Sequence, residues 1–393
     1  MAEYGSGTAA MDPATEAKLQ AWQQERSSDP RGYYAKLRAQ CPVDFEQHLG
    51  AGGDVTVATA AVLSRGDIEE VLRNTNIFSS EMGIMGSEEP VIPLGVDPPL
   101  HAMYRRVLDP LFSPKKMAAL QPTVAAQVNE MIDSFIDKGE VDFSAELAVP
   151  LPCLTFLALL GLPGEELDAL VRWKDIMIRP DIVAGSREAG AELQVRTAGE
   201  IYQRFGMEME ARRDAPRDDL ISYFMTVKVE DGRNLTDSEV LRILFLLLAA
   251  GLDTVTISLQ AIFNYLAEHP EAQQLIQDDP DQIDNVIEEL LRWETPVQNL
   301  TRIARWTPCS RGALSPQAHT SSLPCPRAMS TRRIRSHSPW TSPWATRRTS
   351  RSAAATIDAW ARTLPGWNCG RSCVNGTSAF PHTGSSPGHR SSG

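Results

Sequence analysis

Apolar residues recur at helical spacing over most of residues 29–294, and this periodicity is the main structural signal in the chain. A short alternating stretch at 54–63 is more typical of a strand. Strands are few, and we find no internal repeat and no phosphate-binding glycine loop. The pattern therefore predicts a mainly α fold with small β-sheets. Its expected helices cover 29–40, 66–74, 113–139, 164–176, 189–213, 216–228, 236–267, 269–279 and 281–294.

The most apolar of these helices, 236–267, carries small and polar residues near its middle. One of its faces presents Ile243, Leu246, Leu247, Ala250, Gly251 and Thr254. Ala250 and Gly251 make a shallow dent in that face, against which a flat group could lie. The Thr254 hydroxyl can reach the Ala250 carbonyl, which bends and opens a helix. Asp253 could relay protons beside it. The ordinary alternative is a buried helix crossing with Asp253 facing solvent.

A second segment, 97–105, holds two donors on one helical face. Asp97 is suited to cap this helix and Pro98 to occupy its first position. His101 and Arg105 are four residues apart, so together they offer a site for an anion such as a carboxylate. The alternative is a pair of solvated polar residues on a surface helix.

The third segment, 288–304, combines a charged pair with an extended stretch. Glu289 and Arg292 lie three residues apart, a spacing that in an exposed helix is worth roughly 0.2–0.5 kcal/mol. Pro296 ends the helix, and the stretch after it presents Arg302 as another candidate anion ligand.

Carboxylates at 278–284 and the cysteines give little support for a metal or disulfide site. The four aspartates there lie at a helix end followed by DPDQ, which indicates a solvated turn and a helix N-cap. They are Asp278, Asp279, Asp281 and Asp284. The six cysteines are scattered without zinc-type spacing.

Composition changes abruptly after Arg305. Residues 1–305 contain 27 Lys and Arg against 49 Asp and Glu, whereas 306–393 contain 11 Arg, no Lys and one acidic residue. No helical or alternating period persists in the second part. We therefore treat 1–305 as one domain and 306–393 as a separate tail. The N-terminus shows no secretory signal, and the apolar run from Ile243 to Gly251 is too short for a bilayer, so we expect a cytoplasmic protein without membrane contact.

Four stretches, in chain order, resemble the cytochrome P450 family of haem-thiolate monooxygenases. They are HAMYR (101–105), AGLDT (250–254), ELLR (289–292) and TPVQNLTRIA (295–304). The resemblance covers most of 30–305 and is greatest to the soluble bacterial members. It implies a P450-like helical fold with small sheets over 1–305, incomplete where the haem-iron ligand should follow.

The resemblance also implies the chemistry of the site. The cofactor would be haem b, with electrons supplied from NAD(P)H by a ferredoxin and a ferredoxin reductase. One atom of dioxygen would enter an apolar small molecule, and no nucleic acid or membrane would take part. The implied roles are haem and dioxygen contact for Ala250 and Gly251, proton delivery for Asp253 and Thr254, a buried structural pair for Glu289 and Arg292, and propionate binding for His101, Arg105 and Arg302.

The family's ligand loop, of the form Phe-Gly-x-Gly-x-x-x-Cys-x-Gly, is missing from the chain as written. The nearest stretch is PGWNCG (365–370), whose Cys369 is the only candidate thiolate we find. Read in another frame, 351–370 can be written as that loop and the helix after it. The codons of Trp360–Ala361 then force Gly and those of Trp367–Asn368 force Glu, both where the family pattern requires them. We infer a frame change near Arg305, so that 306–393 is an out-of-frame or disordered tail.

The sequence leaves two other functions to weigh against a defective monooxygenase. A non-enzymatic helical ligand-binding protein would keep the apolar pocket without iron. A nucleic-acid-binding tail would use the arginines of 327–351, although a solvated, structureless tail explains these arginines equally well.

Overall fold

The computed structural model describes residues 21, 24–25, 28–40, 43–44, 61–81, 89–297 and 299–305. Cys369, the arginine-rich segment, the proposed frame change and most of the expected strand at 54–63 lie outside these residues. The chain divides into two compact units, Met1–Ser79 with Thr301–His337, and Ser80–Leu300 with Ser338–Gly393.

The described part of the first unit consists of two helices and two small sheets. Its helices are α2 (Pro30–Gln40) and α3 (Arg65–Arg73), the latter begun by Ser64, whose hydroxyl accepts a hydrogen bond from the Asp67 N–H. Both sheets are antiparallel pairs. They join β1 (Val43–Asp44) to β2 (Ala61–Val62), and β3 (Phe78–Ser79) to β4 (Ile303–Ala304). The helices expected at 29–40 and 66–74 are confirmed.

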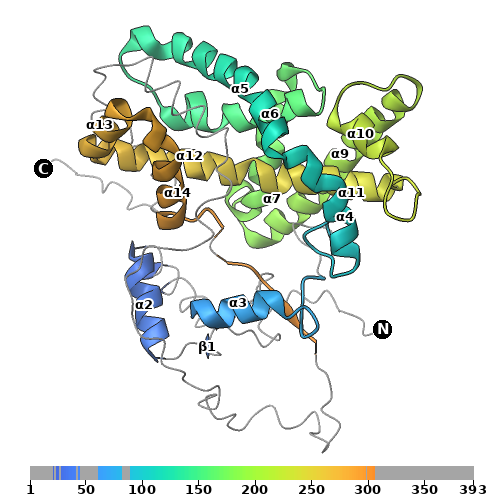
Figure 1. Ribbon diagram of the computed structural model, residues 1–393, viewed down its shortest axis with the longest axis horizontal. Helices are drawn as coiled ribbons and strands as arrows, with labels where there is room; N and C mark the ends of the chain where they lie inside the picture. The colour runs from blue at the N-terminus through green and yellow to red at the C-terminus, as the bar shows by residue number, and fades with distance from the viewer. Residues whose placement is uncertain are drawn as a thin grey trace, which may run out of the picture. The chain divides into compact units, whose positions relative to one another are not determined.

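The described part of the second unit is almost entirely helical, as expected for a mainly α fold (Figure 1). Short 3₁₀ or π turns connect several helices: η1 (Asp109–Phe112), η2 (Ile136–Lys138), η3 (Ser144–Ala148), η4 (Gly164–Glu166) and η5 (Pro280–Gln282). The α-helices are α4 (Leu100–Leu108), α5 (Pro114–Phe135), α6 (Pro150–Leu159), α7 (Leu167–Ile178), α8 (Pro180–Ala184), α9 (Arg187–Asp214), α10 (Leu220–Thr226), α11 (Asp237–Gly251), α12 (Asp253–Glu268), α13 (Pro270–Asp278) and α14 (Ile283–Trp293).

Two local predictions need correction. The single helix expected at 236–267 is two helices, α11 and α12, interrupted at Leu252. The helix expected to start at Pro98 begins at Leu100, and Asp97 does not cap it, because its carboxylate accepts the backbone N–H of Ser80 at 2.8 Å.

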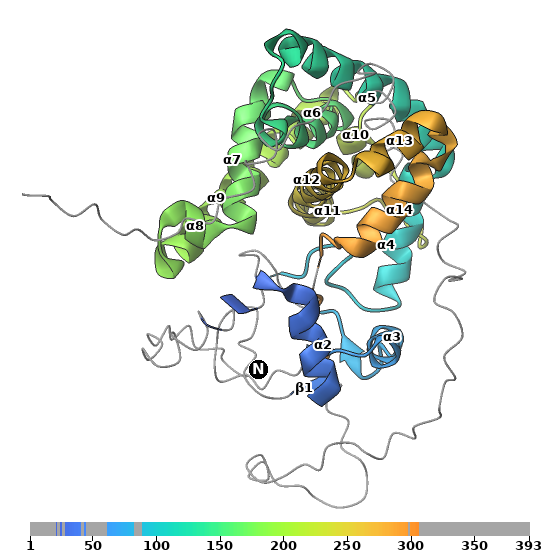
Figure 2. The ribbon, with the colours of Figure 1, turned by 90° about the vertical axis from the view of Figure 1, so that its left-hand side faces the viewer.

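The α11–α12 pair passes through both hydrophobic clusters of this unit. Leu244, Phe245 and Leu248 of α11 pack in a cluster with residues of α4, α6, α7, α9 and α10. Leu259 and Ile262 of α12 pack in another cluster with residues of α5, α13 and α14. In Figure 2 both helices are seen nearly end-on, with the other helices of the unit around them. The interruption at Leu252 therefore falls where the pair leaves one cluster and enters the other.

The stretch Asp237–Glu268 is, by length and composition alone, apolar enough to cross a membrane. However, 56% of its most apolar window is buried inside this protein. A core helix of a soluble protein passes the same test, and packing on both clusters accounts for the apolar composition.

Candidate functional site

The dent predicted at Ala250 and Gly251 is present and open. Both residues are exposed, and a Cβ added to Gly251 would meet no atom within 4 Å. Earlier on the same face, Ile243 and Leu246 are buried. The apolar face thus comes out of the core at the end of α11, with its smallest residues uncovered by any described residue.

The bend predicted from Thr254 is confirmed. Its Oγ1 donates a hydrogen bond to the Ala250 carbonyl oxygen at 2.9 Å, and α11 ends between these two residues. This bond takes the carbonyl out of the regular helical ladder. Thr254 is half-buried and lies on the dented face, so its oxygen can accept a hydrogen bond from a group placed there.

Asp253 points away from the dent, toward α7. Its side chain is buried, and its Oδ1 accepts from Lys174 Nζ at 3.3 Å while Arg179 Nη2 reaches Oδ1 at 3.1 Å and Oδ2 at 3.0 Å. The alternative of a solvent-facing Asp253 is therefore wrong. To serve a group in the dent, this carboxylate would have to leave two cations and turn around the helix.

Lys174 was not singled out in the sequence, although a signal existed. It lies on the apolar face of α7, between Leu170 and Met177, and only 2% of it is exposed. A lysine at such a position needs a buried carboxylate partner. Asp253 supplies it at 3.3 Å, and the partly exposed Asp175 adds a second carboxylate at 2.5 Å.

The predicted anion donors lie on α4 in the second unit. Partial burial, and next the charge of Arg105, lower the pKa of His101, so the imidazole is neutral at pH 7 and offers one N–H. Arg105 is half exposed and pairs with Asp109 at 2.7 Å. Arg105 is therefore the stronger of the two anion donors, and it would exchange Asp109 for the anion.

Tyr104, on the buried side of α4, attaches this helix to the start of α11. Its hydroxyl donates to Glu239 Oε1 at 2.6 Å, and burial raises the pKa of Tyr104 to about 12. Glu239 also accepts from Arg233 and completes a capping box with Thr236. Burial opposes ionisation of Glu239, but these hydrogen bonds outweigh it and lower its pKa to about 2. The network fixes the helix that carries His101 and Arg105.

The remaining predicted residues lie outside α4, α11 and α12. Arg302 belongs to the first unit, where its Nη1 donates to the Thr301 carbonyl at 2.8 Å, so its contact with a propionate stays a prediction. Glu289 and Arg292 form a pair through two hydrogen bonds, at 2.8 and 2.6 Å. About half of each side chain is exposed, as in an ordinary surface pair, and the burial implied by the family resemblance is not observed.

The described residues fit one side of a haem site. The open dent offers a flat apolar wall, and Arg105 offers a donor for a carboxylate. The only cysteine among them, Cys153, is buried, and desolvation raises the pKa of its thiol to about 12, so it does not form a thiolate. Among these residues we find no cluster of three or more His, Cys, Asp or Glu that could hold a metal. Asp279, from the acidic segment, caps η5 instead. No described cysteine can therefore supply a thiolate to haem iron.

Comparison with known proteins gives relatives of one family. The family described as Cytochrome P450 matches residues 187–289. A steroid C26-monooxygenase of Mycobacterium tuberculosis is 30% identical over 281 residues, which are 70% of this chain and 67% of the relative. The cyclomarin C epoxidase of Salinispora arenicola is 32% identical over 269 residues, 66% of this chain and 67% of the relative. A probable cytochrome P450 127A1 of Sinorhizobium fredii is 36% identical over 244 residues, but the chain spans only 56% of its length.

Solved structures agree. Cytochrome P450 CYP109Q5 from Chondromyces apiculatus is similar with a TM-score of 0.60 and 30% identity, over 71% of this chain and 69% of that one. CYP109E1 from Bacillus megaterium, in complex with testosterone, has a TM-score of 0.58 and 29% identity, over 70% of each chain. Relatives of 30% identity or more that the chain covers to two thirds, together with solved structures of the same fold, show that the chain belongs to the cytochrome P450 family.

Proposed function

We propose that this chain derives from a haem-dependent monooxygenase that inserts one oxygen atom from dioxygen into an apolar substrate. The observation that carries the proposal is the open face at the end of α11. There, Ala250 and Gly251 are uncovered, and Thr254 bonds back to Ala250 where the helix is interrupted, which lowers helix stability.

Haem iron is the cofactor of this family, and with a thiolate ligand it supplies the activation of dioxygen. The chain's own residues would hold the haem and leave space beside it for dioxygen. Ala250 and Gly251 would leave room for the flat group and the gas, and Arg105, with His101, would bind a propionate. Thr254 holds a hydrogen bond at the open face.

Asp253 would hold or release a proton only after its carboxylate has left Lys174 and Arg179. In its described position it is an ion-pair partner for α7. Proton delivery through Asp253 therefore includes a rotation of the side chain and the exposure of a buried lysine.

Electrons would come from NAD(P)H through a ferredoxin and its reductase, in the cytoplasm. The steroid C26-monooxygenase and the testosterone complex among the relatives make steroids the first substrates to test. We further propose that the chain as written is inactive, because its family loop with the cysteine ligand is lost through a frame change near Arg305. A non-enzymatic ligand-binding protein is the less favoured function, since the relatives named for a reaction are oxygenases.

The test compares two versions of the gene, the chain as given and one restored to the other frame near codon 305. Each protein is reduced and treated with carbon monoxide, and the absorbance of thiolate-ligated haem is measured. We expect the red-shifted thiolate band, and steroid binding or turnover, from the restored protein only. If the chain as given shows the band and Cys369→Ala abolishes it, the frame-change hypothesis is wrong. If neither protein takes up haem, the monooxygenase proposal fails.

A further inference from the structure

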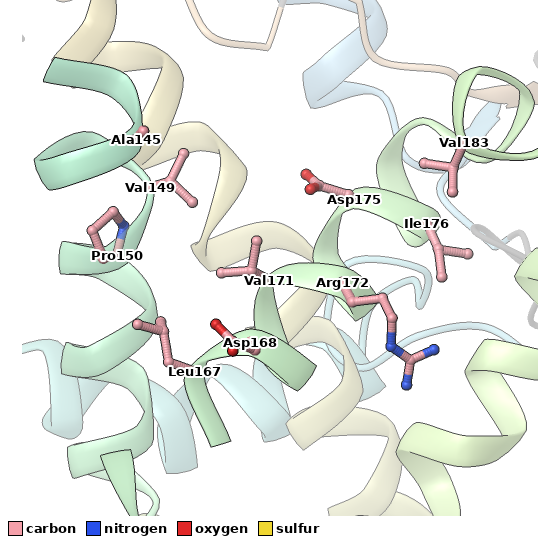
Figure 3. Close-up of a pocket in the computed structure, with 10 residues that line it drawn as sticks. All are labelled: Ala145, Val149, Pro150, Leu167, Asp168, Val171, Arg172, Asp175, Ile176 and Val183. Atoms are coloured by element: carbon pink, nitrogen blue, oxygen red, sulfur yellow. The ribbon is translucent and has the colours of Figure 1, made fainter. Parts of the chain in front are cut away.

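A pocket outside the α11–α12 face lies between α6 and α7. Its volume is about 480 Å³, and it is lined by Ala145, Val149 and Pro150, before and at the start of α6, and by parts of α7 and α8. Figure 3 shows Val149 and Pro150 on one side and Leu167 and Val171 on the other. None of its lining residues belongs to α11 or α12, so it is separate from the dent at Ala250 and Gly251.

Two carboxylates lie in this otherwise apolar lining. Figure 3 shows the oxygens of Asp168 and Asp175 on the side of α7 that faces the gap, whereas the guanidinium of Arg172 is turned away from it. The Arg172 head instead pairs with Glu200 of α9 at 3.2 Å, which leaves its aliphatic stem to line the pocket. The unpaired charge in the lining is therefore that of Asp168, because Asp175 is already paired with Lys174 and Arg179.

Both carboxylates have free acceptor capacity. No described residue makes a hydrogen bond or an ion pair with Asp168. Lys174 and Arg179 both approach Oδ1 of Asp175, at 2.5 and 3.6 Å, and no described residue contacts its Oδ2. A carboxylate oxygen with no protein partner, beside apolar walls, favours a ligand that brings a donor and a positive charge.

We propose that this pocket binds a small apolar amine in its ammonium form. The alkyl part would displace water from Val149, Leu167 and Val171, and the ammonium would donate to Asp168 and to Oδ2 of Asp175. A neutral alcohol of the same shape would donate at most one hydrogen bond and would bring no positive charge to the carboxylates. An anionic one would be repelled. The proposal does not depend on the monooxygenase function, because no residue of the haem face takes part.

The experiment titrates the full chain with three probes of equal length by isothermal calorimetry: hexylammonium, 1-hexanol and hexanoate. We expect hexylammonium to bind about fivefold or more tightly than 1-hexanol, from one charge-assisted hydrogen bond in a solvent-accessible site. Hexanoate should be the weakest. Equal binding of the three probes, or no binding of hexylammonium, would overturn the proposal.

Three variants test whether the probes bind in this pocket. Asp168→Asn keeps the shape of the exposed side chain and should weaken hexylammonium about fivefold while leaving 1-hexanol unchanged. Glu165→Gln, in η4 and outside the pocket, is the matched control for net charge and should have no effect. Val149→Phe fills the cavity and should weaken both ligands. If Glu165→Gln weakens hexylammonium as much as Asp168→Asn does, the binding is a general charge effect and the pocket is not the site.

Discussion

Two carboxylates of the α11–α12 pair, Glu239 at its start and Asp253 at its interruption, are both buried and both paired with cations, but they serve different ends. Glu239 accepts hydrogen bonds from Tyr104, Arg233 and Thr236, which belong to three neighbouring parts of the second unit. Asp253 accepts only from Lys174 and Arg179, and the next residue along the chain lies on the open face.

The contacts around Glu239 stabilise the fold, whereas the helix around Asp253 is less stable than a regular helix would be. At Glu239 every donor belongs to the second unit itself, and the carboxylate also accepts the Thr236 N–H at the N-terminus of α11. At Asp253 the charged contacts hold the closed side of the helix, while Ala250 and Gly251 on the other side are left uncovered. A bent helix with one satisfied and one open side is where a ligand site is expected.

The comparison predicts the largest loss of stability at Glu239. Its pKa is lowered from 4.5 to about 2, and a difference of this size corresponds to about 3 kcal/mol of unfolding free energy. Because the pKa is lower in the folded state, this stability is present above pH 4.5 and is lost as the pH falls toward 2. Glu239→Gln should therefore destabilise the protein by about 3 kcal/mol at pH 7 and flatten the acid limb of its stability curve.

Urea unfolding at several pH values measures both effects. Asp237→Asn, an exposed aspartate on the same turn of α11, is the control and should change stability by under about 1 kcal/mol. If the two variants are equally stable at pH 7, Glu239 is not the anchor of this region.

At Asp253 we expect a smaller loss. Asp253→Asn removes one of two partners of the buried Lys174, but Asp175 remains at 2.5 Å and Arg179 is partly exposed. The cost should be about 2 kcal/mol, less than the usual cost of breaking a buried ion pair. The double variant Asp253→Asn with Lys174→Met also removes the buried lysine, which has lost one of its two carboxylates, and should recover part of that loss. A double variant less stable than Asp253→Asn alone would show that the lysine does not depend on this carboxylate.

Much of this was predictable from local pattern. The helix periods and the bond from Thr254 to Ala250 involve residues a few positions apart, and the structure contains them. The bonds of Lys174 with Asp253 and of Tyr104 with Glu239 join residues 79 and 135 positions apart, and no local pattern specifies such pairs. Asp97 shows the same limit: its sequence fits a cap, yet a distant N–H at Ser80 takes its carboxylate. The open face at Ala250 and Gly251 could be predicted from the sequence, because glycine within an apolar helix lowers the stability of that helix.

Thr254 and Thr256 allow a matched test of the two sides of α12. Both hydroxyls donate to a carbonyl four residues back, Thr254 to Ala250 at 2.9 Å and the buried Thr256 to Leu252 at 3.1 Å. Replacement by Val should cost about 0.5 kcal/mol at Thr254 and about 1 kcal/mol at Thr256, because only the second leaves a carbonyl shielded from water. In the haem-loaded, frame-restored protein, Thr254→Val should be the variant with lower turnover. A larger turnover loss for Thr256→Val would place the functional side of the helix elsewhere.

The smallest effect is expected at Glu289 and Arg292, because both side chains are partly exposed to water. The pair has good geometry, at 2.6 and 2.8 Å, but both side chains are about half exposed. A double-mutant cycle with Glu289→Gln and Arg292→Gln should give a coupling of about 0.3–0.5 kcal/mol that weakens in high salt. Arg292 lowers the pKa of Glu289, so the coupling is complete above the ordinary glutamate pKa and disappears as the pH falls through the lowered value.

The same cycle in the frame-restored protein tests whether the missing region would change this pair. The family resemblance implies that the pair is buried there, and a buried pair couples more strongly because less water screens it. We expect the coupling to rise above about 1 kcal/mol and to lose most of its dependence on salt. An unchanged, salt-sensitive coupling would mean that the exposed pair described here is the final arrangement, and that restoring the frame does not rebuild the core beside α14.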